Sequence, residues 1–135
     1  MSNLFHVSAK DHGALILMST LAERYASGEY VRVQDVAEDM KLSQGYLEET
    51  AACLKEAGLI AGRQGPGGGY RLAKPPASIS MSDILTALEG PLALVDCQAG
   101  SCPVEGKCIS KSVWGKLQKT IHASLEGMSL AEVIN

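Results

Sequence analysis

Apolar residues recur at helical spacing in the first part of the chain. One stripe predicts a helix over residues 10–27 that ends at Gly28, and a shorter stripe predicts a second helix over residues 33–40. Ser43 is a suitable N-cap for a third helix, which Gly58 ends. The inner stripe of the third helix is expected to be Leu47, Ala51, Leu54 and Ala57. Two short helices joined by a tight turn predict a helix-turn-helix.

The helical spacing stops after residue 58 and gives way to a glycine-rich segment. The short runs Leu59-Ile60-Ala61 and Tyr70-Arg71-Leu72 flank Gly65-Pro66-Gly67-Gly68-Gly69, which predicts a β-hairpin with a glycine-rich tip. A hairpin placed directly after a helix-turn-helix is a wing. We therefore expect a mainly α fold, with a winged helix-turn-helix DNA-binding domain over residues 1–76 and a two-stranded wing.

Residues 77–135 show a different organisation. Ser80 and Asp83 fit a capping box that begins a helix, and Gly90-Pro91 ends it. Residues 96–108 have few apolar side chains and are expected to form a loop. A near-heptad stripe then predicts a long final helix suited to pairing with another helix. The members of this stripe are Trp114, Leu117, Ile121, Leu125 and Met128.

Composition narrows the class of protein. A chain of 135 residues can build one sizeable core, and no apolar run approaches the roughly 20 residues of a membrane span. The first ten residues lack the order of a signal peptide, so we expect a cytoplasmic protein with no membrane partner. In that compartment the four cysteines are expected to be thiols or metal ligands rather than structural disulfides.

The net charge of −3 does not favour nucleic-acid binding by bulk electrostatics. Contact with DNA must therefore use local patches, and residues 57–77 supply one because they hold three basic side chains and no acidic one. A homodimer would double such a patch.

Several polar side chains lie where a winged helix-turn-helix reads DNA. Glutamine can pair with adenine and glutamate can accept from cytosine, whereas serine, tyrosine and arginine can contact phosphates. Glycines in the wing would let the backbone approach another backbone closely. The candidate DNA-binding residues are Ser43, Gln44, Tyr46, Glu48, Arg63, Gln64, Gly67, Gly68 and Arg71. The alternative is a solvated helix with a flexible hairpin, and the acidic pair Glu48-Glu49 favours that alternative.

Three cysteines share one polar loop: Cys97, Cys102 and Cys108. The loop lacks apolar neighbours, so they are not core residues. Their wide spacing fits an iron–sulfur cluster with a fourth ligand from elsewhere, then a zinc site, and then a redox-active disulfide that leaves one thiol over. Cys53 is expected to be a small buried apolar residue of the third helix.

Taken together, these segments resemble the IscR/NsrR-type (Rrf-type) winged helix-turn-helix regulators, which sense through iron–sulfur clusters. The resemblance is carried by Tyr46-Leu47-Glu48, residues 65–72, residues 84–90, the three loop cysteines and residues 129–133. Residues 87–94 are most similar to the branch that regulates SUF-type iron–sulfur assembly. The resemblance implies a homodimer held by the long last helix. It also implies a [2Fe-2S] or [4Fe-4S] cluster on each cysteine loop, and DNA affinity that depends on cluster state.

The chain departs from its relatives in two places. Some relatives carry a histidine ligand where Lys111 stands here, and others take the fourth ligand from the first helix of the partner subunit. The position that matches the second pattern is His12, with Asp11 beside it, so the expected metal ligands are the three loop cysteines and His12. Where relatives place an arginine before the Gly-Pro of the wing, this chain has Gln64.

The resulting hypothesis is a DNA-binding transcription regulator that senses iron, redox or nitric-oxide state and controls iron–sulfur assembly or stress genes. Its partners would be a double-stranded operator and a second copy of itself, with no small-molecule substrate. We expect no enzyme, because the sequence has neither a Ser/His/Asp set nor a phosphate-binding loop. The alternative from another class is an iron–sulfur or zinc protein that acts as a carrier or electron-transfer module.

Overall fold

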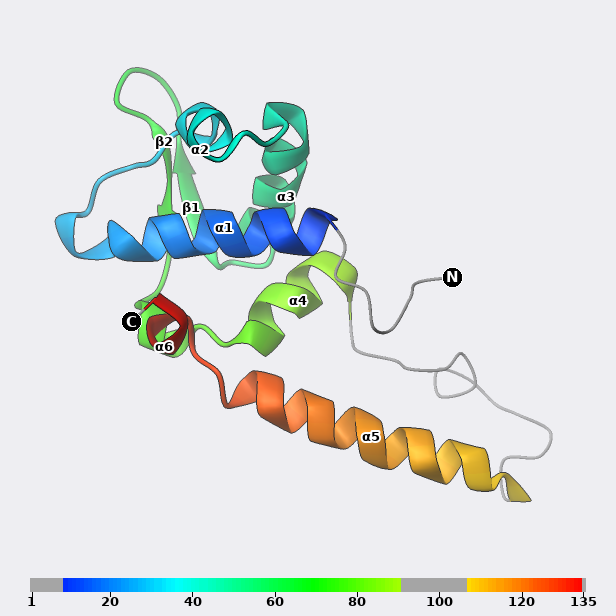
Figure 1. Ribbon diagram of the computed structural model, residues 1–135. Helices are drawn as coiled ribbons and strands as arrows, with labels where there is room; N and C mark the ends of the chain where they lie inside the picture. The colour runs from blue at the N-terminus through cyan, green and yellow to red at the C-terminus, as the bar shows by residue number, and fades with distance from the viewer. Residues whose placement is uncertain (1–8, 91–106, 135) are drawn as a thin grey trace.

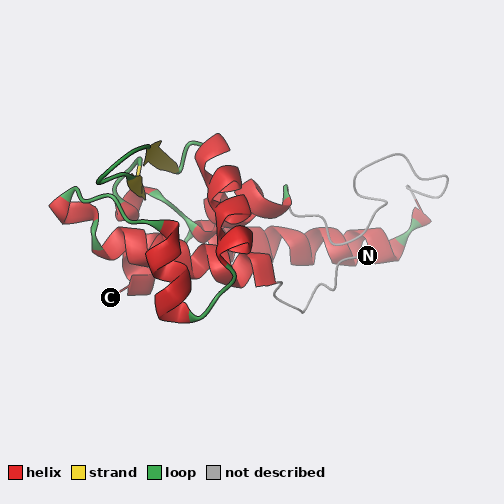
Figure 2. Cartoon of the chain, turned by 90° about the horizontal axis from the view of Figure 1, so that it is seen from above, coloured by secondary structure: helices red, strands yellow, loops and turns green. Residues whose placement is uncertain are grey.

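The computed structural model describes residues 9–90 and 107–134 of the chain. Figure 1 shows the arrangement of the elements, and Figure 2 shows that helices dominate the described part, with the two short strands at one edge. The helices and strands are α1 (Ala9–Glu23), the 3-10 helix η1 (Tyr25–Ser27), α2 (Val33–Met40), α3 (Gln44–Glu56), β1 (Ile60–Arg63), β2 (Gly69–Leu72), the 3-10 helix η2 (Pro76–Ser78), α4 (Met81–Glu89), α5 (Ile109–Glu126) and α6 (Leu130–Ile134).

Helix α1 is the centre of the molecule. It lies across the middle of Figure 1, with α2, α3 and the wing above it and α4 and α6 below it. Its side chains Leu17, Met18 and Leu21 are buried and belong to one aliphatic cluster with residues from all of these elements. The cluster also contains Ile84 and Leu130, so a single core draws residues from both sides of position 76.

The first helix ends earlier than its apolar stripe predicts. Helix α1 ends at Glu23, and the 3-10 helix η1 covers residues 25–27. The cause is local, because the Ser27 hydroxyl donates to the Arg24 carbonyl (2.8 Å) in competition with a continued helix. Gly28 then ends the segment with a φ of +71°, as predicted.

The third helix agrees with its prediction at both ends but not in the last member of its stripe. Ser43 is the N-cap, and Leu47, Ala51 and Leu54 are buried. Ala57, by contrast, is exposed, because it is the C-cap residue and lies beyond the last turn that packs on the core.

The C-terminal elements α4 and α6 pack against the core and are linked by hydrogen bonds near their N-terminal ends. The predicted capping box of α4 is present, with reciprocal 3.0 Å hydrogen bonds between Ser80 and Asp83. The Leu130 amide donates to the Ile79 carbonyl (2.8 Å), and the Met81 amide donates to the Met128 carbonyl (2.9 Å). The chain on each side of residue 80 is therefore tied to the start of α6.

Helix α5 is the predicted long helix, although a short helix, α6, follows it. It projects from the rest of the molecule in Figure 1, and none of its residues is buried. Trp114, Leu117, Ile121 and Leu125 are half-buried, so their stripe is only partly covered within one chain. None of the described helices has the length and apolar content needed to cross a membrane.

Candidate nucleic-acid interface and metal ligands

The N-terminal turn of α3 presents polar side chains to solvent. The Ser43 hydroxyl accepts a hydrogen bond from the Tyr46 amide (3.3 Å), which fixes the start of the helix. Gln44, Tyr46 and Glu48 are exposed, whereas Leu47 is buried and anchors the helix to the core. The Gln44 side-chain amide donates to the Glu48 carboxylate (3.4 Å). Both candidate base-reading side chains thus lie on one exposed face.

The tip of the wing is a defined turn. The Gly68 amide donates to the Gly65 carbonyl (2.9 Å), with Pro66 and Gly67 between them. The φ of Gly67 is +74°, and proline followed by a left-handed glycine is typical of a type II turn. Gly68 itself is buried, and a Cβ there would lie 2.2 Å from the Arg63 carbonyl oxygen. The absence of a side chain at Gly68 therefore lets two backbone segments of the wing itself approach each other closely.

The recognition-helix candidate and the wing line one open groove with a volume of about 400 Å³. The groove brings together five of the predicted DNA-binding residues: Gln44, Glu48, Arg63, Gly67 and Gly68. Its lining does not include the other four, Ser43, Tyr46, Gln64 and Arg71, all of which are exposed. In Figure 1 the wing tip, α2 and the start of α3 share the upper edge of the molecule.

Sequence reasoning missed two residues of this region. Arg32 lines the groove, and its guanidinium donates to the Gln34 side chain (3.0 Å). Tyr30 lies beside the wing, with the guanidinium carbon of Arg71 4.8 Å and that of Arg63 5.7 Å from its ring centroid. Both residues lie in the segment between η1 and α2, which the sequence indicated only as a short extended link. Its pairing with the wing is not local, so no spacing signal pointed to it.

The chemistry of the groove suits DNA. Arg32 and Arg63 offer guanidiniums that can bind phosphates or guanine, and Gln44 offers an amide that can pair with adenine. Glu48 is the acidic member of the groove lining, and its hydrogen bond with Gln44 holds the two side chains in one orientation.

The expected metal ligands are only partly within the described residues. Cys97 and Cys102 lie outside them. Cys108 is a half-buried free thiol at the N-cap position of α5, and His12 is exposed in the first turn and a half of α1. The described part of the chain contains no group of three or more histidine, cysteine or acidic residues that could hold a metal ion.

The start of α1 is in contact with two other elements. The Lys10 ammonium donates to the Leu88 carbonyl near the end of α4 (3.4 Å). A Cβ on Gly13 would lie 3.3 Å from Leu47 Cδ2, so the backbone of α1 touches α3 one residue after His12. In Figure 1 the start of α1 and the end of α4 lie close together, whereas the start of α5 lies at the far end of the projecting helix.

Known proteins share this fold over nearly the full length of the chain. The chain is 34% identical to a solved structure of T. potens IscR, with a TM-score of 0.78 over 97% of this chain and 87% of the other. The structure of CymR, described as the global cysteine regulator of B. subtilis, is 26% identical, with a TM-score of 0.78 over 97% of both chains. The HTH-type transcriptional regulator IscR of Klebsiella pneumoniae is 29% identical over 96% of this chain and 79% of the relative.

A family model also matches the chain. Residues 7–135 match the model named Rrf2 and described as an iron-dependent transcriptional regulator. This match, together with the mainly helical fold and its two-stranded wing, agrees with the resemblance found in the sequence. The chain is therefore a member of the Rrf2 family of transcriptional regulators.

Proposed function

We propose that this transcriptional regulator binds its operator as a homodimer and that its affinity depends on an iron–sulfur cluster held by Cys97, Cys102, Cys108 and His12 of the second copy. The signal would be iron, redox or nitric-oxide state, and the targets would be iron–sulfur assembly or stress genes. Helix α3 would enter the major groove while the wing contacts the flanking backbone. The shared groove between α3 and the wing supports this mode of binding.

The position of Cys108 carries the cluster proposal. Its thiol is free and half-buried, and it is the N-cap residue of α5. The expected ligand loop therefore joins the dimerisation-helix candidate without an intervening residue. Three thiolates and one imidazole are a suitable donor set for an iron–sulfur cluster, which would supply a redox- and iron-sensitive link between them.

The contacts of α1 give a route from these ligands to DNA. His12 precedes Gly13, whose backbone packs on Leu47 of α3. A ligand bond to His12 of one copy would fix the start of its α1 relative to Cys108 and α5 of the other copy. Because α1 packs on α3, this bond would restrain the spacing of the two recognition helices, which must match the helical turn of DNA.

The cysteines of this chain, rather than its fold, favour an iron–sulfur cluster over other means of sensing. The fold also occurs in a protein described as a cysteine regulator, so the architecture alone does not specify the cofactor. The proposal depends on the donor residues of this particular chain.

The first test is anaerobic purification followed by iron and sulfide analysis and an absorption spectrum. We expect brown protein that contains both elements, and Cys102→Ala should lose them while remaining folded. Cys53→Ala is the matched control and should retain them, because Cys53 lies on α3 and packs against the core. Colourless wild-type protein with stoichiometric zinc would contradict the proposal.

The second test is a gel shift with the DNA upstream of the protein's own gene. Cluster-loaded and cluster-stripped protein should differ in affinity. Equal affinity of the two forms would reject the sensing role but leave the DNA-binding role intact. Failure of both forms to bind, together with a cluster that transfers electrons or iron and sulfide to another protein, would favour the carrier alternative.

A further inference from the structure

Two arginines of the wing lie on the same face of its hairpin. In the β1–β2 register Arg63 is opposite Gly69, and Ala61 is opposite Arg71. The two arginines are therefore diagonal neighbours, and such positions are roughly 7–8 Å apart in an antiparallel pair. Two positive side chains that share one face repel each other, and a group that attracts both would offset this repulsion.

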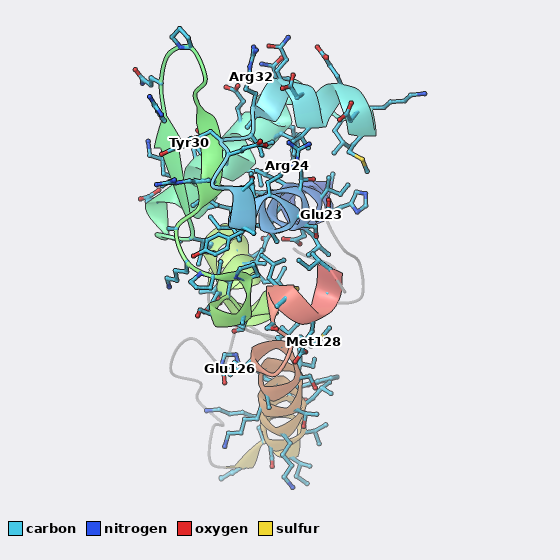
Figure 3. All side chains as sticks on the ribbon, turned by 90° about the vertical axis from the view of Figure 1, so that its left-hand side faces the viewer. Glu23, Arg24, Tyr30, Arg32, Glu126 and Met128 are labelled. Atoms are coloured by element: carbon cyan, nitrogen blue, oxygen red, sulfur yellow. The ribbon has the colours of Figure 1, made fainter. Side chains whose placement is uncertain are left out.

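Tyr30 is the group that both guanidiniums contact. The guanidinium carbon of Arg71 is 4.8 Å from its ring centroid, and that of Arg63 is 5.7 Å away. Both distances lie within the range of about 6 Å over which a ring attracts a cation. Figure 3 shows Tyr30 beside the strands of the wing and Arg32 nearer the wing tip.

No carboxylate of the described residues forms an ion pair with these two cations. Glu29, the acidic neighbour of Tyr30, is paired instead with Arg24 (3.1 Å). Neither wing arginine takes part in an ion pair within the described part of the chain, and both are exposed. Their charge is thus available to an anion from outside.

Main-chain hydrogen bonds hold the backbone next to Tyr30 against the wing. Val31, the residue after Tyr30, exchanges two hydrogen bonds with Tyr70, with nitrogen–oxygen distances of 2.7 and 2.8 Å. Tyr70 precedes Arg71 in β2. A Cβ on Gly69 would lie 2.4 Å from the Val31 carbonyl oxygen, so only glycine permits the link to lie this close to the strand. The position of Tyr30 relative to Arg71 is therefore set by main-chain bonds.

We propose that Tyr30 is a positioning residue that holds the guanidiniums of Arg63 and Arg71 as one pair for binding DNA phosphates. This inference depends on the proposed DNA-binding function and adds a residue that does not itself need to touch DNA. Arg63 also lines the groove beside α3. The pair would therefore bind the phosphates that flank the site read by the recognition helix.

The test compares three variants on two DNA probes, a random-sequence duplex and the fragment upstream of the protein's own gene. Tyr30→Leu removes the ring, Tyr30→Phe keeps it, and Tyr25→Leu is the matched control because Tyr25 is also a partly exposed tyrosine between α1 and α2. Dissociation constants are measured by fluorescence anisotropy at several salt concentrations.

We expect Tyr30→Leu to weaken binding to both probes about threefold to tenfold, as the loss of one or two exposed cation–π contacts implies. The slope of log affinity against log salt should decrease in magnitude by about one, which corresponds to the loss of one phosphate contact. Tyr30→Phe and Tyr25→Leu should match wild type. In an Arg63→Ala/Arg71→Ala background, Tyr30→Leu should have no further effect, because Tyr30 acts through these two side chains.

The outcomes separate this inference from the function it depends on. Wild-type protein that binds neither probe contradicts the proposed function. Wild-type binding with an unchanged affinity and salt slope in Tyr30→Leu overturns the inference alone, and so does a Tyr30→Phe variant as weak as Tyr30→Leu.

A measurement without DNA covers the case in which Tyr30→Leu does not fold. Ring currents from Tyr30 should shift the side-chain Nε–H resonances of Arg63 and Arg71 in the free wild-type and Tyr30→Phe proteins. Unshifted resonances in both would overturn the inference.

Discussion

Gly69 has a backbone conformation that a side chain cannot share. Its φ is +140°, and a Cβ would lie 2.4 Å from the Val31 carbonyl oxygen. Gly69→Ala should therefore lower the free energy of unfolding by about 2–4 kcal/mol, because backbone strain and overpacking add at this site. Urea denaturation measures the change.

Gly45 provides the control for that substitution. It lies within α3 with open space around its Cβ position. Gly45→Ala should stabilise the protein by about 0.5–1 kcal/mol, because alanine has the higher helix propensity. Equal effects of the two substitutions would show that the contact between Gly69 and Val31 is not tight in solution.

Arg63 combines the two features expected of a phosphate ligand, since it is exposed and lines the groove beside α3. Arg63→Ala should weaken binding to all DNA sequences and reduce the magnitude of the salt slope by about one. Lys74→Ala is the control, because Lys74 lines a different groove, between α3 and α4. A larger salt effect for Lys74 would move the DNA-binding surface away from the wing.

His12 is the fourth ligand that we propose, and Lys111 occupies the other position to which the sequence resemblance pointed. His12→Ala should change the absorption spectrum of the anaerobic protein or speed its bleaching in air, whereas Lys111→Ala should do neither, because an ammonium is a poor iron ligand. The reverse pattern, or no effect of either change, would exclude His12 as a ligand.

At the scale of elements, the sequence predicted what depends on neighbours along the chain. The caps of α3 and α4 are hydrogen bonds between residues three positions apart, so Ser43 and Ser80 predict them from the local sequence. The hairpin follows from its glycine and proline residues in the same way. Tyr30 could not be found, because its partners are 33 and 41 positions away along the chain and come together only when the link pairs with β2. The role of Cys97 and Cys102 as metal ligands remains a prediction, because both lie outside the described residues.

Helix α6 is short, and Leu130 is its one buried residue. Leu130 is fully buried, whereas Val133 is 39% exposed. Leu130→Ala should cost about 2–5 kcal/mol of stability, as for other buried leucines, and Val133→Ala should cost less than about 1 kcal/mol. Thermal unfolding followed by circular dichroism distinguishes them, and similar midpoints would mean that α6 is not docked in solution.

At the scale of the whole molecule, α5 has an apolar stripe that the rest of the chain covers only in part. None of its residues is buried, and Ile109 and Val113 are 80% and 52% exposed. Leu117→Asp, in the middle of the half-buried stripe, should convert a dimer into monomers, because it places a charge in an apolar interface. Lys116→Asp, on an exposed position of the same helix, should leave the dimer intact.

Sedimentation velocity at several protein concentrations measures the oligomeric state of both variants. A wild-type protein that is monomeric at every concentration would contradict the dimer proposal. Dissociation by Lys116→Asp alone would place the interface on another face of α5.

The burial of Leu130 also bears on the order in which the protein matures on the ribosome. A chain is made from its N-terminus, and Leu130 follows the three cysteines and α5. The hydrophobic cluster beneath the DNA-reading elements therefore lacks one of its members until the thiols and the long helix have been synthesised. A nascent regulator cut short before this leucine would carry an unfinished core, which favours its removal by quality control over its premature occupation of a promoter.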